Sequence, residues 1–404
     1  MKTGRLLALL AATVTLASLL PGEASAVPVF ARKYGFNCTM CHSAFPRLND
    51  FGARFRANGY RLQGRHEVEK TVLETPTPVA LRTSAGYVYD ELRHQPEGMP
   101  SGKRSTTELG GLDILSGGLL GPRIGFFLIY VPGIEATRGV AGQDAALEMA
   151  SVVFSGLARD RLTVRAGRFE PAYAAFSVKR QLSASPYEVY DYSFPGGPKF
   201  SDTQTGVEAR GGGHGCIRAI AGLVGGSGTN RDEDPPQDGY VRVEGVLGPG
   251  EGQTAGQRLG LTGYLGRARP DVSVGASTDR AECFDRLGVD ASLNARGLSL
   301  AAQYLWARDG GPLWGQGDHV CWSGGFVELS ATPATNTAGF ARFDLVREPS
   351  FIDRTVTRFT AGGRFYFEDN VTLHVEYSHQ NMSAPDVVDD ATEDFLAVRV
   401  DFAI

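Results

Sequence analysis

The sequence predicts an all-β protein, an antiparallel transmembrane β-barrel of about 16 strands with a small N-terminal helical segment that we expect to plug it. Three observations support this prediction. The 404 residues include 52 glycines and many short runs of alternating apolar and polar residues, a pattern typical of strands joined by turns. After residue 26 no run approaches the length of a membrane-spanning helix. The predicted strands are even in number, and their connections alternate between short and long, as in bacterial outer-membrane barrels.

The first 26 residues are predicted to be a signal peptide. Lys2 and Arg5 precede an apolar run over residues 6–20, and residues 24–26 read A-S-A, the small-x-small site that signal peptidase cleaves. A retained membrane anchor is the alternative, but the run is shorter than the ~20 apolar residues that a spanning helix needs. We therefore expect export from the cytoplasm and a mature chain that begins at Val27.

A haem-attachment motif defines the next predicted unit, residues 27–75. Residues 38–42 read C-T-M-C-H, and C-x-x-C-H is the signature of covalent c-type haem attachment. Two thiols on one turn reach the two vinyl groups of the porphyrin, and the adjacent histidine faces the iron from the same side. The sequence therefore predicts one covalently bound c-type haem, with Cys38 and Cys41 as thioether anchors and His42 as the proximal iron ligand.

Other uses of a C-x-x-C pair have little support in the rest of the chain. A zinc site needs a second pair of ligands, and Cys216, Cys283 and Cys321 form no second C-x-x-C. A redox dithiol of the thioredoxin type needs a βαβ context, which the sequence lacks. Cys283 and Cys321 fall in successive predicted loops and are the expected disulfide pair, and three separate thiols are the alternative.

The sequence leaves the sixth ligand of the iron open. Met40 lies inside the attachment loop and is badly placed for the distal side. His66 is a candidate distal ligand, and Met99, a histidine of the barrel or a water molecule are the other candidates. Because His66 lies in a charged stretch, a solvated histidine is the alternative interpretation.

The N-terminal segment is basic and too small to shield a haem alone. Its roughly 44 residues are near the lower limit for an independent core, so the rest of the chain must help to enclose the group. Residues 27–70 contain eight Lys or Arg and three Asp or Glu, whereas the whole chain has a net charge of −5. We expect lumen carboxylates to face Arg32, Arg54 and Arg56, and the alternative is that these arginines face the periplasm.

Residues 76–404 are predicted to form the barrel. The clearest alternation lies in the last strand, where apolar residues from Leu396 to Ile404 alternate with Arg399, Asp401 and alanines. A strand of a soluble sandwich would show the same pattern, but the even strand count and the loop lengths favour a barrel. Sixteen strands are wide enough for an aqueous lumen. The predicted strands lie at 79–91, 106–115, 122–131, 146–156, 161–169, 203–211, 215–224, 239–247, 257–266, 284–293, 298–307, 324–331, 338–347, 356–367, 370–380 and 395–404.

The connections predict how the barrel sits in its membrane. Connections after odd-numbered strands, such as 170–202, are mostly long, and those after even-numbered strands, such as 157–160, are mostly short. Because the long loops of outer-membrane barrels face outward, we expect external loops at the cell surface, both termini on the periplasmic side and outer-membrane lipid around the strands. The amphipathic final strand suits recognition by the barrel-assembly machinery. We expect no nucleic-acid partner.

A pattern of aromatic, proline and asparagine residues surrounds the haem motif. It consists of Pro28, Phe30-Ala31-Arg32, Phe45-Pro46, Leu48-Asn49, Phe51-Gly52, Phe55 and Asn58-Gly59-Tyr60. Together with the motif, this pattern resembles the fused outer-membrane monohaem cytochrome–porin family associated with bacterial Fe(II) oxidation. The resemblance is specific over about 35 residues; in the barrel it is one of architecture only.

The resemblance implies a redox activity. It implies that the protein accepts one electron from extracellular Fe(II) onto its haem, as an Fe(II) oxidase would, and passes it to a periplasmic c-type cytochrome or another acceptor. Two acidic stretches, 232–238 and 386–394, are candidates for attracting Fe(II) and otherwise solubilise loops. The alternative is a haem-plugged porin that conducts small solutes or uses a different electron donor. No hydrolase motif is present.

Overall fold

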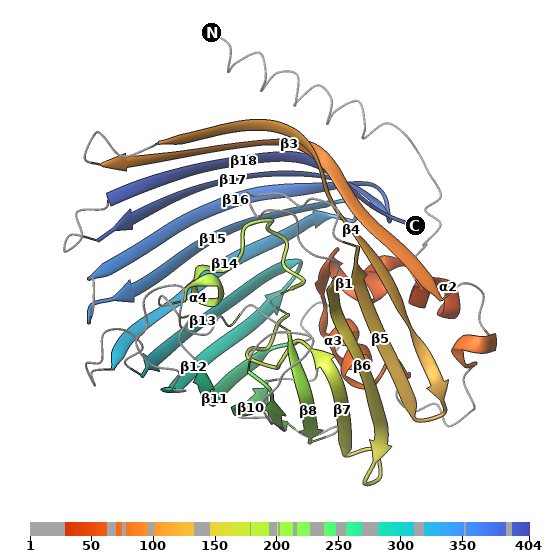
Figure 1. Ribbon diagram of the computed structural model, residues 1–404. Helices are drawn as coiled ribbons and strands as arrows, with labels where there is room; N and C mark the ends of the chain where they lie inside the picture. Colours follow the sequence, from red (N-terminus) through yellow and green to blue (C-terminus); the bar gives the residue numbers. More distant parts are fainter. Residues whose placement is uncertain are drawn as a thin grey trace.

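The computed structural model is a closed barrel with the N-terminal segment at one end (Figure 1). The structure describes residues 29–62, 70–74, 78–95, 101–132, 146–177, 179–193, 200, 203–212, 216–226, 238–247, 256–268, 282–310, 319–350, 353–384 and 390–404. The predicted signal peptide and the candidate distal ligands His66 and Met99 lie outside these residues. In the part of the chain that is described, no helix is long and apolar enough to cross a membrane.

Within the described residues, the barrel consists of sixteen antiparallel strands, and β18 pairs with β3 to close the ring. The predicted fold class is therefore confirmed. A sheet that crosses a bilayer has to close, because an open edge would leave backbone N–H and C=O groups without partners in lipid. The strands are β3 (Val79–Gln95), β4 (Gly102–Gly121), β5 (Ile124–Val131), β6 (Ala146–Leu157), β7 (Leu162–Phe169), β8 (Gln204–Gly211), β9 (Ile217–Val224), β10 (Asp238–Val246), β11 (Arg258–Ala268), β12 (Glu282–Ala295), β13 (Leu298–Asp309), β14 (Val320–Ala334), β15 (Thr337–Glu348), β16 (Arg354–Glu368), β17 (Val371–Ser383) and β18 (Asp390–Ala403).

The strands differ from the prediction mainly at the ends that carry the long connections. β3 continues to Gln95 instead of residue 91, and β4 begins at Gly102 instead of residue 106. The ladder there pairs Glu91 with Lys103, so the hairpin continues after the apolar alternation has ended. Alternation in a sequence marks contact with lipid, whereas backbone hydrogen bonds extend beyond the bilayer.

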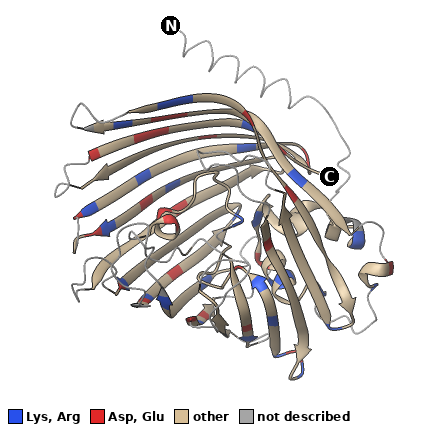
Figure 2. Cartoon of the chain, in the orientation of Figure 1, with Lys and Arg blue, Asp and Glu red and all other residues tan. Residues whose placement is uncertain are grey.

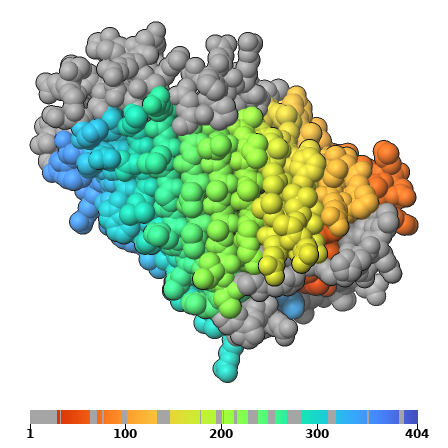
Figure 3. Space-filling model, turned by 90° about the horizontal axis from the view of Figure 1, so that it is seen from below, coloured from red at the N-terminus to blue at the C-terminus, as the bar shows by residue number. Residues whose placement is uncertain are grey.

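The two faces of the strands have opposite character. Large apolar side chains such as Leu261, Trp306 and Phe343 are about half exposed on the outer wall, as expected for strands surrounded by lipid. Figure 3 shows part of this wall, where successive strands lie side by side in sequence order. On the inner face, charged side chains such as Glu328 and Arg342 are buried. These charges require partners within the lumen, because an unpaired buried charge is strongly destabilising.

The N-terminal segment is built from short elements around an aromatic core. Phe30 stacks on Tyr60 with ring centres 4.3 Å apart, and Phe55 meets both rings edge-on. The Asn49 side chain caps the longest helix by accepting a hydrogen bond from the Gly52 N–H at 2.9 Å. The elements are α2 (Val29–Tyr34), η1 (Cys38–Met40), β1 (His42–Ala44), β2 (Arg47–Leu48), α3 (Asp50–Ala57) and η2 (Val72–Glu74). The segment is helical, as predicted, with one short antiparallel pair, β1 and β2, added.

The N-terminal segment packs against the inner face of β4 and β5. A Cβ at Gly125 would lie 1.9 Å from the backbone oxygen of Gly59, and a Cβ at Gly117 would lie 2.7 Å from the Phe30 ring. Glycine inside a strand permits this close approach of another backbone. The segment therefore occupies the barrel end at which β3 begins and β18 ends, which agrees with the predicted plug (Figure 1).

Ion pairs fasten the N-terminal segment to the rest of the chain. Arg47 pairs with Glu328 of β14 at 2.5 Å, and Asp50 pairs with Arg258 of β11. Figure 2 shows that residues of both charges occur along the strands. The segment therefore contributes both a basic and an acidic residue to these ion pairs. The sequence predicted only basic residues of the segment against acidic residues of the lumen.

The three arginines expected to meet carboxylates behave differently. Arg56 pairs with Glu170, directly after β7, at 3.0 Å, as predicted. Arg54 instead pairs with Asp50 of its own helix at 2.9 Å, because residues four apart are neighbours on a helix surface. The side chain of Arg32 lies outside the described part of the structure.

The connection between β7 and β8 also folds into the lumen. We call residues 170–177 and 179–193 the inward loop; they include α4 (Glu188–Asp191), which contacts β14 and β15. Tyr187 of this loop stacks on Phe326 of β14 with ring centres 4.0 Å apart, and Tyr173 and Tyr190 are buried in the same aromatic cluster. The inward loop therefore fills part of the lumen in addition to the N-terminal segment, which the sequence did not predict.

The expected disulfide between Cys283 and Cys321 is wrong. Cys283 belongs to β12 and Cys321 to β14, and β13 lies between these strands. Two strand spacings amount to about 10 Å, which exceeds the Cα separation of about 7 Å that a disulfide can bridge. Both residues, and Cys216, are exposed free thiols, which is the alternative that the sequence left open.

We predict that Gly125→Ala loosens the N-terminal segment. The added methyl group would overlap the Gly59 carbonyl, and overpacking of this kind costs about 1–3 kcal/mol. Hydrogen–deuterium exchange at the amides of α3 should become faster while the barrel stays folded. Gly121→Ala is the matched control, since a Cβ there meets no atom within 4 Å. Equal exchange rates in the two variants would contradict the packing described above.

Candidate functional site

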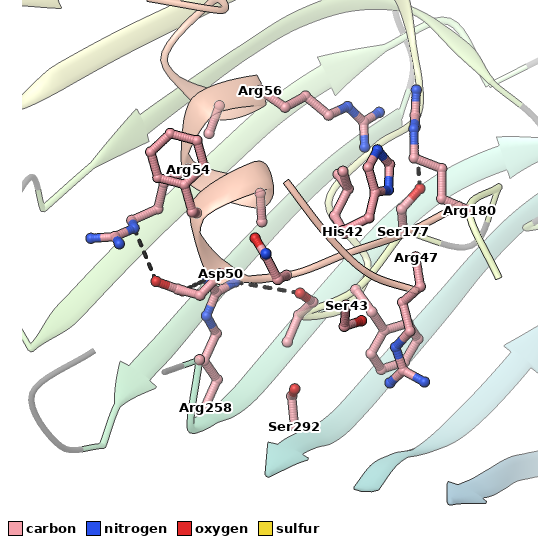
Figure 4. A pocket seen from close by; sticks show the side chains of 18 of the residues that line it. His42, Ser43, Arg47, Asp50, Arg54, Arg56, Ser177, Arg180, Arg258 and Ser292 are labelled. Carbon is pink, nitrogen blue, oxygen red and sulfur yellow. Dashed lines mark hydrogen bonds and ion pairs between the residues drawn. The ribbon is translucent and has the colours of Figure 1, made fainter. Parts of the chain in front are cut away.

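A cavity of about 1030 Å³ separates the N-terminal segment from the barrel wall and the inward loop. His42 and α3 line one side, residues from Glu170 to Tyr187 line another, and strands from β6 to β14 complete it (Figure 4). Its volume lies at the upper end of the range of roughly 300–1,000 Å³ that is usual for small-molecule and cofactor sites. The cavity can therefore hold a group of considerable size beside His42.

The C-T-M-C-H turn is held by backbone contacts and by one asparagine. The Cys41 N–H donates to the Cys38 carbonyl at 3.2 Å and closes η1. The Asn49 amide donates to the carbonyls of Thr39 and Met40 at 3.2 and 3.0 Å, and its own N–H donates to the Cys41 carbonyl at 2.9 Å. Asn49 therefore joins the turn to the start of α3, which fixes where the motif points.

The His42 side chain is arranged as a metal ligand requires. Its Nδ1 lies 3.1 Å from the Pro46 carbonyl, which can only accept, so Nδ1 carries the proton and Nε2 keeps its lone pair. Burial lowers the pKa of His42 to about 4. The imidazole is thus neutral at physiological pH, which is the form that binds iron.

The two motif cysteines lie on the same turn as His42 but do not line the cavity. The Cys38 Sγ is 3.6 Å from the carbonyl oxygen of Asp369, which lies in the turn between β16 and β17. Burial, with the nearby Asp369 charge, raises the pKa of Cys38 to about 12, and burial raises the pKa of Cys41 to about 11. As free residues both are therefore protonated thiols.

These residues fit a c-type haem. The structure brings two free thiols and a neutral imidazole with an available Nε2 together on one turn, next to a cavity of cofactor size. Cys38, Cys41 and His42 would hold the group. Among the described residues, no set of three His, Cys, Asp or Glu side chains could hold a metal ion by itself.

Arginines dominate the part of the cavity near His42. Arg56 and Arg180 both pair with Glu170 Oε2, at 3.0 and 3.7 Å. The Glu170 carboxylate is buried, but Arg56, Arg180, the Ser177 hydroxyl and the Lys179 N–H outweigh that burial and hold its pKa near 2. Burial and the neighbouring Arg56 charge lower the pKa of Arg180 to about 10. Positive charge is therefore crowded at this point.

A second pair of arginines lies beside the first. Arg165 and Arg210 each pair with Glu208 at 2.7 Å, and Arg165 also donates to the Glu170 carbonyl at 2.9 Å. Both guanidinium groups line the cavity, whereas Glu208 does not.

The sequence predicted a carboxylate partner for Arg56, but it identified neither the inward loop nor Arg165, Arg180 and Arg210. One signal was available, because the connection at 170–202 is the longest predicted one and connections longer than about 15 residues are uncommon and often functional. The meeting of Arg56 with Glu170 and Arg180 gives no sequence signal, since Arg56 lies more than a hundred positions from both residues.

The acidic stretches proposed to attract cations fall largely outside the described residues, at 232–237 and 386–389. Of the described members, Asp238 is buried and accepts hydrogen bonds from the Tyr264 hydroxyl at 2.7 Å and the Arg267 N–H at 2.9 Å. Asp394 accepts from Tyr377 at 2.7 Å and lies 2.8 Å from His379 Nδ1. These two carboxylates therefore have structural partners within the barrel wall.

Comparison with known proteins relates this chain to porins by fold. No protein-family model matches the chain, and no curated protein does. Among solved structures, the anion-selective porin from Comamonas acidovorans has a TM-score of 0.55 at 14% identity and covers 81% of this chain and 99% of its own. The outer membrane channel DcaP of Acinetobacter baumannii has a TM-score of 0.53 at 11% identity and covers 85% and 99%. OprB of Pseudomonas putida has a TM-score of 0.50 at 13% identity and covers 80% and 94%. At these identities the likeness is one of fold, a porin-like barrel.

Proposed function

We propose that the chain is a bacterial outer-membrane barrel that transfers one electron at a time through a c-type haem bound by its N-terminal segment. The observation that carries the proposal is the C-x-x-C-H turn beside a cofactor-sized cavity, with His42 neutral and its Nε2 available. When bound, a c-type haem supplies a one-electron redox centre whose potential depends on its ligands, burial and neighbouring charges.

The chain's own residues do three things in this proposal. Cys38 and Cys41 anchor the group, and His42 binds the iron, with Pro46 orienting the ring through Nδ1. Asn49 keeps the turn in place. The aromatic cluster of the inward loop and barrel wall separates the cavity from the barrel end with the long connections and limits water there.

The porin-like fold supports an outer-membrane location, with outer-membrane lipid around the apolar wall. By the rule that long loops of such barrels face outward, the long connections would lie at the cell surface and both termini in the periplasm. The haem segment would then lie on the side of a periplasmic c-type cytochrome, the proposed acceptor. Insertion by the barrel-assembly machinery belongs to the same proposal.

Fe(II) is the proposed donor because of the resemblance of the N-terminal segment. An electron alone would cross the barrel, so insoluble Fe(III) would stay outside the cell. Asp238 and Asp394 are engaged in the wall, and no three His, Cys, Asp or Glu side chains among the described residues are grouped so that they could hold this donor.

Conduction of small solutes is the second candidate function. The porin-like fold favours it, as does the arginine-rich cavity, since one structural neighbour is an anion-selective porin. Against it, the N-terminal segment and the inward loop both occupy the lumen and are fastened to the wall by ion pairs and aromatic contacts.

The first prediction from this proposal concerns the anchors. Replacing both Cys38 and Cys41 with Ala should abolish covalent haem, because no thioether can form. Haem-dependent peroxidase staining after denaturing electrophoresis measures this directly. Cys216→Ala is the control, since that thiol is exposed and outside the motif. Staining that survives the double substitution would rule out the proposed attachment.

The second prediction concerns the donor. Mixing the oxidised, haem-loaded protein with Fe(II) should reduce the haem within seconds to minutes, as followed by its absorbance. If dithionite reduces the haem and Fe(II) does not, iron is the wrong donor while the haem assignment stands. His42→Ala should abolish the normal response because the iron loses its proximal ligand.

The third prediction separates electron transfer from conduction. The full chain in a planar lipid bilayer should pass little current, because both inserts fill the lumen. Large, regular current steps of the kind that open porins give would favour the channel instead.

A further inference from the structure

We propose that Arg56, Arg165, Arg180 and Arg210 form a binding site for two carboxylate groups, the propionates of the haem. This inference rests on the proposed function, because it requires a haem attached at Cys38 and Cys41. It goes further by assigning residues that bind the polar edge of the haem. The C-x-x-C-H motif gives no information about that edge.

The charge balance at the site is the first argument. Four guanidinium groups share two carboxylates, Glu170 and Glu208, through four ion pairs. Among the described residues, two of these positive charges are therefore left without a carboxylate of their own, and two propionates carry two negative charges. Charges that are largely shielded from water are destabilising unless they are paired, so an anion of about this charge would balance the site.

The other carboxylates near the cluster, among the described residues, already have cationic partners. Asp160 pairs with Arg61 at 3.0 Å, Glu148 with Lys179 at 3.7 Å, Asp113 with Arg82, and Glu244 with Arg218 at 3.3 Å.

The second argument is that Glu170 cannot use all the N–H donors of the arginines that surround it. Its carboxylate already accepts from the Ser177 hydroxyl at 2.7 and 3.0 Å and from the Lys179 N–H at 3.1 Å, besides pairing with Arg56 and Arg180. Each guanidinium has five N–H donors, so most donors of these arginines are not used by Glu170. The unused donors lie on residues that line the cavity.

The position of the cluster is the third argument. Figure 4 shows the His42 ring pointing toward the side chains of Arg56 and Arg180, and the Arg180 charge acts on the imidazole. Arg165 is 8% exposed and Glu208 is fully buried, whereas the side chains of Arg56, Arg180 and Arg210 are 18%, 14% and 29% exposed, so water screens the cluster only in part. A ligand bound to His42 would therefore meet the arginines within the same cavity.

Arginine is suited to carboxylates in particular. Its planar fork binds a carboxylate through two parallel hydrogen bonds, and such charge-assisted bonds are about twice as strong as neutral ones. A neutral or cationic ligand would leave the positive charge of the cluster unbalanced. The charge of the site therefore favours a ligand whose edge carries two carboxylates over an uncharged ligand.

The test is a potentiometric titration of the haem-loaded protein between about pH 5 and pH 9, a range in which free carboxylates and arginines do not titrate. In the wild type the midpoint potential should change little with pH, because the arginines keep the propionates ionised. Arg180→Gln should lower the potential, since a cation that favours the reduced haem is lost. The potential should also rise as the pH falls, because a propionate left in a buried site without its partner takes up a proton within this range.

Matched variants separate this role from a general effect of charge. Arg218→Gln removes one positive charge from the same cavity, but Arg218 belongs to the pair with Glu244, outside the cluster. It should leave the potential independent of pH. Arg180→Lys keeps the charge and should restore most of the pH independence. Because Arg56 still pairs with Glu170 when Arg180 is replaced, the fold has a remaining counterion.

Three results would overturn the inference. If Arg180→Gln and Arg218→Gln gave the same pH profile with haem bound, the propionates would lie elsewhere and the proposed function would stand. If inorganic phosphate shifted the wild-type potential saturably and Arg180→Gln abolished that shift, the arginines would hold a free anion instead. If the matured protein carried no covalent haem, the proposed function would fail and this inference with it.

Discussion

Buried charge inside a closed ring is the constraint on which the rest of the structure depends. Sixteen strands enclose more space than their inner side chains fill, and those side chains include carboxylates that need partners. Glu328 pairs with Arg47 of the N-terminal segment at 2.5 Å and accepts a hydrogen bond from the Tyr187 hydroxyl of the inward loop at 3.3 Å. Glu376 accepts hydrogen bonds from the inward loop, including the Ser185 hydroxyl at 2.6 Å. The same wall therefore holds both inserts, and neither insert needs a large core of its own.

The position of the C-T-M-C-H turn follows from this arrangement. The barrel wall contacts the turn directly, because Asp369 Oδ2 accepts from the Cys38 N–H at 3.4 Å and the Tyr366 hydroxyl donates to the Phe45 carbonyl at 2.9 Å. From the other side, Asn49 ties the turn to α3. The Cys38 thiol consequently lies against the wall, and His42 lines the cavity. A segment of this size could not orient these groups alone.

The sequence predicted the barrel well because a membrane strand repeats one local rule, apolar outside and polar inside, sixteen times over. All the predicted strands were correct in place, and the errors were confined to their ends, as at β4, which continues to Gly121 instead of residue 115. The inward loop was not predicted, because its contacts join residues far apart in the chain, such as Ser185 with Glu376. In the site, the motif identified Cys38, Cys41 and His42 as candidates. Arg56 was expected to meet a lumen carboxylate, but its partner Glu170 and the neighbouring Arg180 could not be found, because charged residues in a loop look the same in sequence whether they are solvated or buried.

The pairing of the first strand with the last sets an order of assembly. β3 and β18 lie about 300 positions apart in the chain, so the ring has an open edge until the final strand has been made. The N-terminal segment packs on β4 and β5, and the Gly59 backbone occupies space that only Gly125 leaves free. The seat on β4 and β5 is complete once the first strands of the sheet have paired. The ion pairs of the segment with Arg258 of β11 and Glu328 of β14 require strands that follow much later in the chain, so the segment can be fully fastened only as the ring nears closure.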